Sequence, residues 1–192
     1  NYVDLLGKEK PENEKMREYI DVLQRQSARL KKLIEDLLEA SKASTGNLTV
    51  NAEPCDVGVL LDQTLGEYGE KLSAAGLEPV LTKPEKPVII MADGRHMWRI
   101  FDNLLNNICK YSQRGTRVYL EVCERDGKAV VTFRNISSRQ LNISSDELME
   151  RFVRGDSSRN TEGSGLGLNI AQSLAQLQKG TMELTVDGDL FK

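Results

Sequence analysis

The chain has 192 residues, of which 39% are hydrophobic and 29% are charged, so it can form a sizeable core and is not a wholly disordered chain. Its 26 Lys and Arg against 29 Asp and Glu give a net charge of −3, which excludes a general nucleic-acid binder, because such proteins carry a strong basic excess. No apolar run approaches the roughly 18 residues of a membrane span, so a soluble, cytoplasmic chain is expected. The three cysteines, Cys55, Cys109 and Cys123, are scattered and are predicted to be free thiols.

Residues 14–43 are predicted to form one long helix, because they contain neither Gly nor Pro and good helix formers dominate. Apolar residues recur seven positions apart at Met16, Leu23, Leu30 and Leu37. This spacing is typical of the narrow seam of a coiled coil or helix bundle. Residues 2–6 resemble the end of an earlier helix, so we expect a helical hairpin cut from a longer protein. A dimeric four-helix bundle would complete it.

From residue 48 onward the pattern is mixed. Strands are predicted at 48–53, 77–82, 88–91, 117–123, 129–133 and 181–186, and helices at 56–75, 93–111, 145–152 and 166–178. The turn Asp126-Gly127 predicts a hairpin, and Asp56 is expected to cap a helix. The large apolar residues interpreted as core are Met91, Met97, Trp98 and Phe101. This order predicts an α+β fold, a two-layer sandwich with helices on one face of a mixed sheet.

Amide side chains share one face of the predicted helix 93–111. Asn103, Asn107, Lys110 and Tyr111 stand three or four positions apart, while Ile100, Leu104, Leu105 and Ile108 would bury the other side. Asn oxygens suit Mg²⁺, a hard cation that also shares phosphate oxygens, and Lys110 is a candidate phosphate contact. The alternative is a solvated helix face on which Asn has no special role.

Three glycines at alternate positions, Gly163, Gly165 and Gly167, precede an amphipathic helix. They expose backbone N–H groups at a helix N-terminus, where the helix dipole favours anions, so the stretch predicts a phosphate cradle. The spacing is neither the dinucleotide-binding fingerprint nor a P-loop. Taken alone, the glycines are weak evidence, and a plain flexible loop is the better interpretation of them.

Together, the two motifs resemble the nucleotide-binding domain of the sensor histidine kinases, whose superfamily also contains gyrase, MutL and the large heat-shock chaperone ATPases. Residues 103–112 resemble the asparagine box of this Bergerat-type fold, 150–156 the phenylalanine box and 163–170 the second glycine box. The resemblance implies that Asn103, Asn107 and Lys110 take part in catalysis and that Asn107 holds Mg²⁺. The residues implied to bind ATP are Asn103, Asn107, Lys110, Tyr111, Asn135, Arg154, Gly163, Ser164, Gly165, Leu166, Gly167 and Leu168.

The resemblance extends to the helical hairpin and so implies two domains. Residues 1–46 would be the end of the dimerisation and phosphotransfer hairpin, and 47–192 the ATP-binding domain, with its last strand truncated and a hinge at 44–47. The implied activity is transfer of the γ-phosphate of Mg-ATP to a histidine outside this fragment, for relay to the receiver domain of a response regulator. The parent protein would be a homodimer, anchored in the cell membrane of a bacterium.

The chain departs from the family pattern at two places. The first glycine box, an Asp-x-Gly-x-Gly, is replaced by residues 133–138 without glycine. Asn135 could still accept a hydrogen bond from adenine, as a weaker neutral acceptor. No phospho-accepting histidine is present either, because the only histidine, His96, is interpreted as a helix-surface side chain in the nucleotide domain. The acceptor is expected shortly before Asn1.

Two other functions stay open on the sequence. A hydrolytic ATPase of the superfamily would carry a glutamate one helical turn before the metal-binding asparagine, and here that position is Asn103, which cannot act as a general base. A degenerate module that dimerises and signals without catalysis stays possible because the first glycine box is absent. Arg25, Arg29, Lys31 and Lys32 are interpreted as a solvated face, with docking of an acidic response regulator as the alternative.

Overall fold

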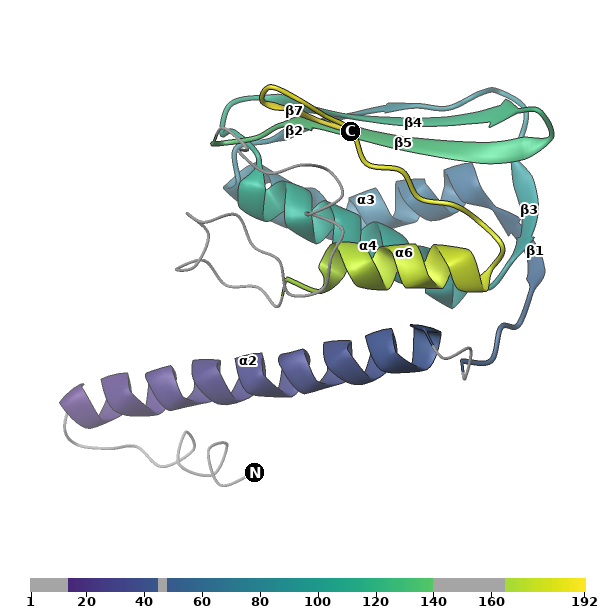
Figure 1. Ribbon diagram of the computed structural model, residues 1–192. Coiled ribbons are helices and arrows are strands. Elements are labelled where there is room, and N and C mark those ends of the chain that lie inside the picture. Colours follow the sequence, from purple (N-terminus) through teal and green to yellow (C-terminus); the bar gives the residue numbers. More distant parts are fainter. Residues whose placement is uncertain (1–13, 45–47, 140–164) are drawn as a thin grey trace. The chain divides into compact units, whose positions relative to one another are not determined.

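The computed structural model describes residues 14–44, 48–139 and 165–192 (Figure 1). The chain divides into two compact units, 1–39 and 40–192, and each is described by itself. None of the helices within those three described ranges is both long and apolar enough to span a membrane.

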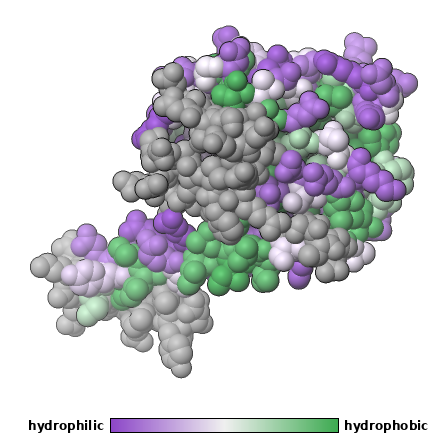
Figure 2. All heavy atoms as spheres, in the orientation of Figure 1, coloured by the Kyte–Doolittle hydropathy of each residue, from purple (hydrophilic) through white to green (hydrophobic). Residues whose placement is uncertain are grey.

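Helix α2 (Glu14–Ser44) is the one element described before residue 48, and it confirms the predicted helix to within one residue. Its seam residues are exposed, with Leu30 at 59% and Leu23 at 51%. Figure 2 shows hydrophobic and hydrophilic residues together at the surface of this helix. Lys32 pairs with Asp36 one turn later, at 3.3 Å. The first arm of the expected hairpin, residues 2–6, lies outside the described residues.

The larger unit is built on a five-stranded mixed sheet in the order β2-β4-β5-β7-β6. Its strands are β2 (Glu78–Thr82), β4 (Arg117–Arg125), β5 (Lys128–Ile136), β6 (Val186–Asp187) and β7 (Leu190–Phe191). β2 and β4 are parallel and the other neighbours antiparallel. The β4–β5 hairpin turns at Asp126 and Gly127 with φ of 52° and 72°, so the predicted turn is confirmed. A separate two-stranded sheet pairs β1 (Glu53–Asp56) with β3 (Ile89–Ala92).

Three helices, α3 (Val57–Ala74), α4 (Gly94–Tyr111) and α6 (Gly167–Leu177), cover one face of the large sheet (Figure 1). The core lies between the two layers and includes Phe101, Leu105, Val118, Leu120, Ile170 and Leu174. Asp56 caps α3 by accepting from the backbone N–H groups of Gly58 and Val59, as predicted. The expected two-layer α+β fold is confirmed.

Two of the predicted strands are wrong in position. The pattern at 48–53 predicted a strand there, whereas pairing starts only at Glu53, because β1 is aligned by its partner β3. The pattern at 181–186 reflects alternate half-burial without a strand ladder, since Met182 packs against the core while its neighbours face solvent. Pairing begins at Val186, and the chain then turns at Gly188 so that β7 reaches β5. The predicted helix 145–152 lies outside the described residues.

Two single-residue interpretations are also corrected. Met91 was expected in the core but is 63% exposed, because β3 alternates and places Ile89 and Met91 on the uncovered face of the small sheet. His96 was expected on the helix surface, yet only 15% of its side chain is exposed. Its Nε2 lies 3.2 Å from the carbonyl oxygen of Thr49, in the segment that leads into β1.

A buried carboxylate, Asp93, connects this leading segment with two helices. Its Oδ1 accepts the N–H groups of Arg95 and His96 and so caps α4, while Oδ2 accepts the N–H of Asn51 at 3.0 Å. Its own N–H donates to Oε1 of Gln178, at the end of α6. Burial alone would raise the pKa of Asp93, but the backbone donors outweigh it and the net shift is downward.

Asp93→Asn is expected to lower the free energy of unfolding at pH 7 by about 1–2 kcal/mol, because the amide loses a charged acceptor. A lowered carboxyl pKa stabilises the fold above the unfolded-state pKa of about 3.9, and that stabilisation is lost as the pH falls through the folded-state pKa. The difference between wild type and variant should therefore shrink in acid. Urea unfolding at pH 7 and at pH about 3 measures this, with Asp187→Asn on the exposed end of β6 as the control. A difference independent of pH would contradict it.

Candidate functional site

Helix α4 carries the predicted amide face, and the structure gives its side chains different degrees of burial. Asn103 is 7% exposed, Asn107 is half-buried, and Lys110 is exposed near the end of the helix. The amide nitrogen of Asn103 donates to the carbonyl oxygen of Arg99, one turn earlier, at 2.8 Å. This bond leaves the amide oxygen of Asn103 as the atom that faces away from its own helix.

The N-terminus of α6 lies directly against these amides. A Cβ atom placed on Gly167 would be 3.4 Å from Oδ1 of Asn103 and 3.5 Å from Nδ2 of Asn107. These are ordinary van der Waals distances, so a side chain at residue 167 would fit against both amides, and glycine leaves that space beside them unfilled. Segments far apart in the sequence, the asparagine box and the described part of the second glycine box (residues 165–170), therefore meet at one place.

The residues around Gly167 hold the start of α6 in place. Gly165 has φ of +72°, a conformation that L side chains rarely adopt, and Leu166 is 1% exposed in the core. Leu166 is also the N-cap residue, and its side chain cannot accept a hydrogen bond from the helix. Leu168 is half-buried in the first turn. An anion is therefore a suitable partner for the N–H groups of this helix end.

The first turn of α6 also carries a polar side chain, Asn169, that the sequence did not single out as a site residue. Oδ1 of Asn169 is buried without a hydrogen-bond partner within the residues that the structure describes. An unpartnered buried oxygen costs about 1–3 kcal/mol, so it is unusual in a structural helix. A signal was present in the sequence, since Asn169 is the polar exception among apolar neighbours at the start of a predicted amphipathic helix.

Asn135 lies at the other end of the amide face. It is 6% exposed on β5, and its Nδ2 donates to the hydroxyl of Ser112, immediately after α4, at 2.9 Å. The N–H of Ser138 donates to the carbonyl oxygen of Tyr111, which fastens the end of β5 to the end of α4. Asn107 and Tyr111 are one helical turn apart, about 6 Å along the axis. The site is thus elongated, with Gly167 near one end and Asn135 near the other.

Three predicted site residues, Arg154, Gly163 and Ser164, lie outside the described residues, as does the phenylalanine box. Of the predicted ATP-binding residues that are described, the structure brings Asn103, Asn107 and Gly167 together and places Tyr111 beside the segment that follows β5.

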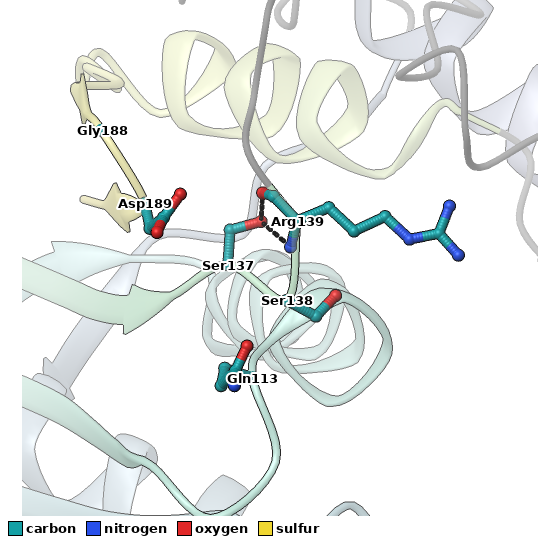
Figure 3. A pocket seen from close by; sticks show the side chains of 6 residues that line it. All are labelled: Gln113, Ser137, Ser138, Arg139, Gly188 and Asp189. Carbon is teal, nitrogen blue, oxygen red and sulfur yellow. Dashed lines mark hydrogen bonds between the residues drawn. The ribbon is translucent and has the colours of Figure 1, made fainter.

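A hollow of about 300 Å³ lies beyond Asn135, between the ends of α4 and β5 and the β6–β7 turn (Figure 3). Gln113, Ser137, Ser138, Arg139, Gly188 and Asp189 line it. Ser137 Oγ donates to the carbonyl oxygen of Arg139 at 2.7 Å and so is engaged in local structure. None of the predicted site residues within the described ranges lines this hollow, so it is not part of the amide face.

Comparison with known families identifies the chain. Residues 92–189, just over half of it, match the family described as "Histidine kinase-, DNA gyrase B-, and HSP90-like ATPase". The chain belongs to this family. Residues 1–46 also match the "His Kinase A (phospho-acceptor) domain", which identifies the sensor histidine kinase branch that the asparagine and glycine boxes predicted.

Individual proteins agree with this assignment. The chain is 29% identical over 165 residues to the signal transduction histidine-protein kinase BaeS of Escherichia coli, a match that covers 85% of this chain and 35% of BaeS. The chain thus spans about a third of the length of this relative.

Solved structures show the same fold. Full-length ShkA in complex with AMPPNP superposes with a TM-score of 0.81 at 22% identity, over 99% of this chain and 40% of ShkA. The histidine kinase ThkA, in complex with the response regulator protein TrrA, superposes with a TM-score of 0.69 at 14% identity, over 99% of this chain and 54% of ThkA. The fold expected of a histidine kinase ATPase domain is confirmed.

Proposed function

We propose that this chain is the ATP-binding catalytic portion of a two-component sensor histidine kinase. It binds Mg-ATP and transfers the γ-phosphate to a histidine outside these residues. The observation that supports this best is the approach of Gly167, at the N-terminus of α6, to the amides of Asn103 and Asn107.

The donor set fits a magnesium nucleotide. Asn oxygens are ligands that suit Mg²⁺, and the absence of a Cβ at Gly167 leaves unfilled space beside both amides. In this proposal Asn107 holds the metal, Asn103 and Lys110 contact the phosphates, and the backbone of 163–168 cradles them at the helix end. Mg²⁺ held there would neutralise charge on the phosphates, which together with positioning accounts for most of the catalysis of phosphoryl transfer.

The adenine would lie toward the other end of α4. Asn135 uses its amide nitrogen for Ser112, so its oxygen is the acceptor for an adenine amino group. Tyr111 and, from the part outside the described residues, Arg154 complete the proposed nucleotide contacts. Because Asn135 is a neutral acceptor, it should bind adenine less tightly than the carboxylate of the family pattern.

Transfer to a histidine is favoured over hydrolysis by the residue one turn before Asn107. Asn103 carries an amide, which has no proton-accepting capacity near neutral pH and cannot activate water as a general base. Because the first glycine box is absent, a degenerate module without catalysis stays the other alternative. The experiment below separates these functions.

Two partners follow from the same proposal. The exposed seam of α2, which includes Leu23 and Leu30, would pair with the hairpin of a second copy in a dimeric four-helix bundle. The phosphorylated histidine would pass its phosphate to the receiver domain of a response regulator, the class of protein to which TrrA, the partner of ThkA, belongs. Anchoring of a longer parent protein in a bacterial membrane stays a prediction.

The chain should label a histidine in trans. Incubated with γ-labelled ATP, Mg²⁺ and a separate hairpin from its own full-length parent, it should phosphorylate that hairpin slowly, since a bimolecular encounter forgoes several kcal/mol of proximity. The label should be lost in acid, as phosphohistidine is acid-labile. The chain by itself should stay unlabelled, and His96→Ala should change nothing, because His96 contacts Thr49 at a distance from the amide face.

Each alternative has its own outcome in this experiment. Absence of binding heat with millimolar Mg-ATP in isothermal titration would favour the degenerate module. Steady release of inorganic phosphate without labelling would indicate a hydrolytic ATPase, and acid-stable label on the chain itself would indicate a serine- or threonine-directed kinase.

A further inference from the structure

The side of α4 that faces α3 carries a polar contact outside the proposed nucleotide site. Tyr68, on α3, is 3% exposed, and its hydroxyl donates to Oδ1 of Asp102 at 2.6 Å. The other oxygen of this carboxylate accepts from Nη1 of Arg99, one turn earlier on α4, at 3.0 Å. Asp102 is thus held from a neighbouring helix and from its own helix at the same time.

The contact between Tyr68 and Asp102 is a strong one. A phenol that donates to a carboxylate at 2.6 Å makes a short, charge-assisted hydrogen bond. Burial, and then the hydrogen bond to Asp102, raise the pKa of Tyr68 well above its ordinary value, so the hydroxyl keeps its proton at any physiological pH. Lys71, on the same helix, lies over the ring with Nζ 4.4 Å from its centre and helps to hold the ring in place.

Arg99 connects this contact with the amide face. Its guanidinium binds Asp102, and its backbone carbonyl accepts the amide nitrogen of Asn103 at 2.8 Å. The hydrogen bonds therefore run from Tyr68 on α3, through Asp102 and Arg99, to the amide whose oxygen faces Gly167 on α6. Three helices are joined through one turn of α4.

The position of α4 about its own axis decides where its amides lie. A rotation of about 10° would move a side-chain tip on a helix of this radius by about 1 Å, comparable to the displacement that costs about 100-fold in a catalytic site. Apolar packing by Phe101 and Leu105 is non-directional, so it resists such a rotation less specifically than a hydrogen bond does.

We propose that Tyr68 and Asp102 are positioning residues for the nucleotide site: their bond between α3 and α4 sets the rotation of α4 and thereby the place of Asn103 and Asn107 against Gly167. The inference rests on the proposed function. Neither residue touches the nucleotide, and both act through the amides, which lie on a different face of the helix.

Tyr68→Phe tests the proposal, because it removes only the hydroxyl. Isothermal titration of the whole chain should show Mg-ATP binding weakened about tenfold, while ATP binding in EDTA changes by less than about twofold, since the amides act on the metal-bound phosphates. Tyr119→Phe is the matched control: it removes a hydroxyl from a half-exposed tyrosine on β4 and should leave both affinities unchanged. Asp102→Asn, which keeps a neutral acceptor for Tyr68, should weaken Mg-ATP binding to an intermediate extent and carries the test if Tyr68→Phe does not fold.

Three results would overturn the inference. Wild-type affinity of a folded Tyr68→Phe variant for Mg-ATP would show that the bond does not position the amides. Equal weakening with and without Mg²⁺ would indicate a general structural role. A wild-type chain that binds no Mg-ATP would overturn the proposed function and this inference together, so the two failures are distinguishable.

Discussion

Asn107→Ala is expected to reduce phosphate transfer from Mg-ATP to a separate hairpin at least about 100-fold, because it removes the proposed metal ligand, and even residues that only support a metal ligand contribute about 10–100-fold. The half-buried amide beside Gly167 would be replaced by a methyl group that can neither ligate a cation nor orient a phosphate. Transfer is measured as acid-labile label on the hairpin, and Mg-ATP binding by isothermal titration.

A matched control tests whether the loss of labelling is specific to the site. Gln63→Ala removes an exposed amide from α3, on a helix that carries none of the proposed ligands, and should leave labelling unchanged. Both variants should melt within a few degrees of the wild type. Normal labelling by Asn107→Ala would remove Asn107 from the proposed mechanism.

Gly167→Ala is expected to separate stability from function. Alanine is the better helix former, so the free energy of unfolding should be unchanged or rise by up to about 0.5 kcal/mol. Mg-ATP binding should nevertheless weaken at least about tenfold, because the new Cβ, 3.4 Å from Oδ1 of Asn103 and 3.5 Å from Nδ2 of Asn107, fills the space through which a cation reaches these amides. Urea unfolding and isothermal titration measure the two effects.

The control for this substitution is Gly69→Ala on α3, where a Cβ would meet no atom within 4 Å. It should stabilise the fold without changing Mg-ATP affinity, since Gly69 is exposed and lies on a different helix from the site. If Gly167→Ala bound Mg-ATP as tightly as the wild type, the close approach of α6 to α4 would be a matter of packing and would lose its place in the proposed function.

Much of the fold could be predicted because helices and hairpins depend on neighbours in the sequence. The absence of Gly and Pro predicted α2 nearly to the residue, Asp56 predicted the start of α3, and Asp126-Gly127 predicted the turn of the β4–β5 hairpin. The strands predicted at 48–53 and 181–186 were placed wrongly, because the ends of a strand depend on the strand with which it pairs. β1 starts at Glu53, the first of its residues that pairs with β3. The C-terminal residues form β6 and β7 because β7 pairs with β5.

The candidate site, too, could be predicted from the sequence only in part. The family and the amide face of α4 followed from the sequence alone, because helical spacing places Asn103 and Asn107 on one side whatever packs against it. Two contacts depended on the packing of α4 between α3 and α6: the approach of Gly167 to those amides, and the bond of the Tyr68 hydroxyl to Asp102 on another face of α4. No periodicity within one segment encodes such contacts, because their geometry is set by side chains that the chain brings together only when the layers form.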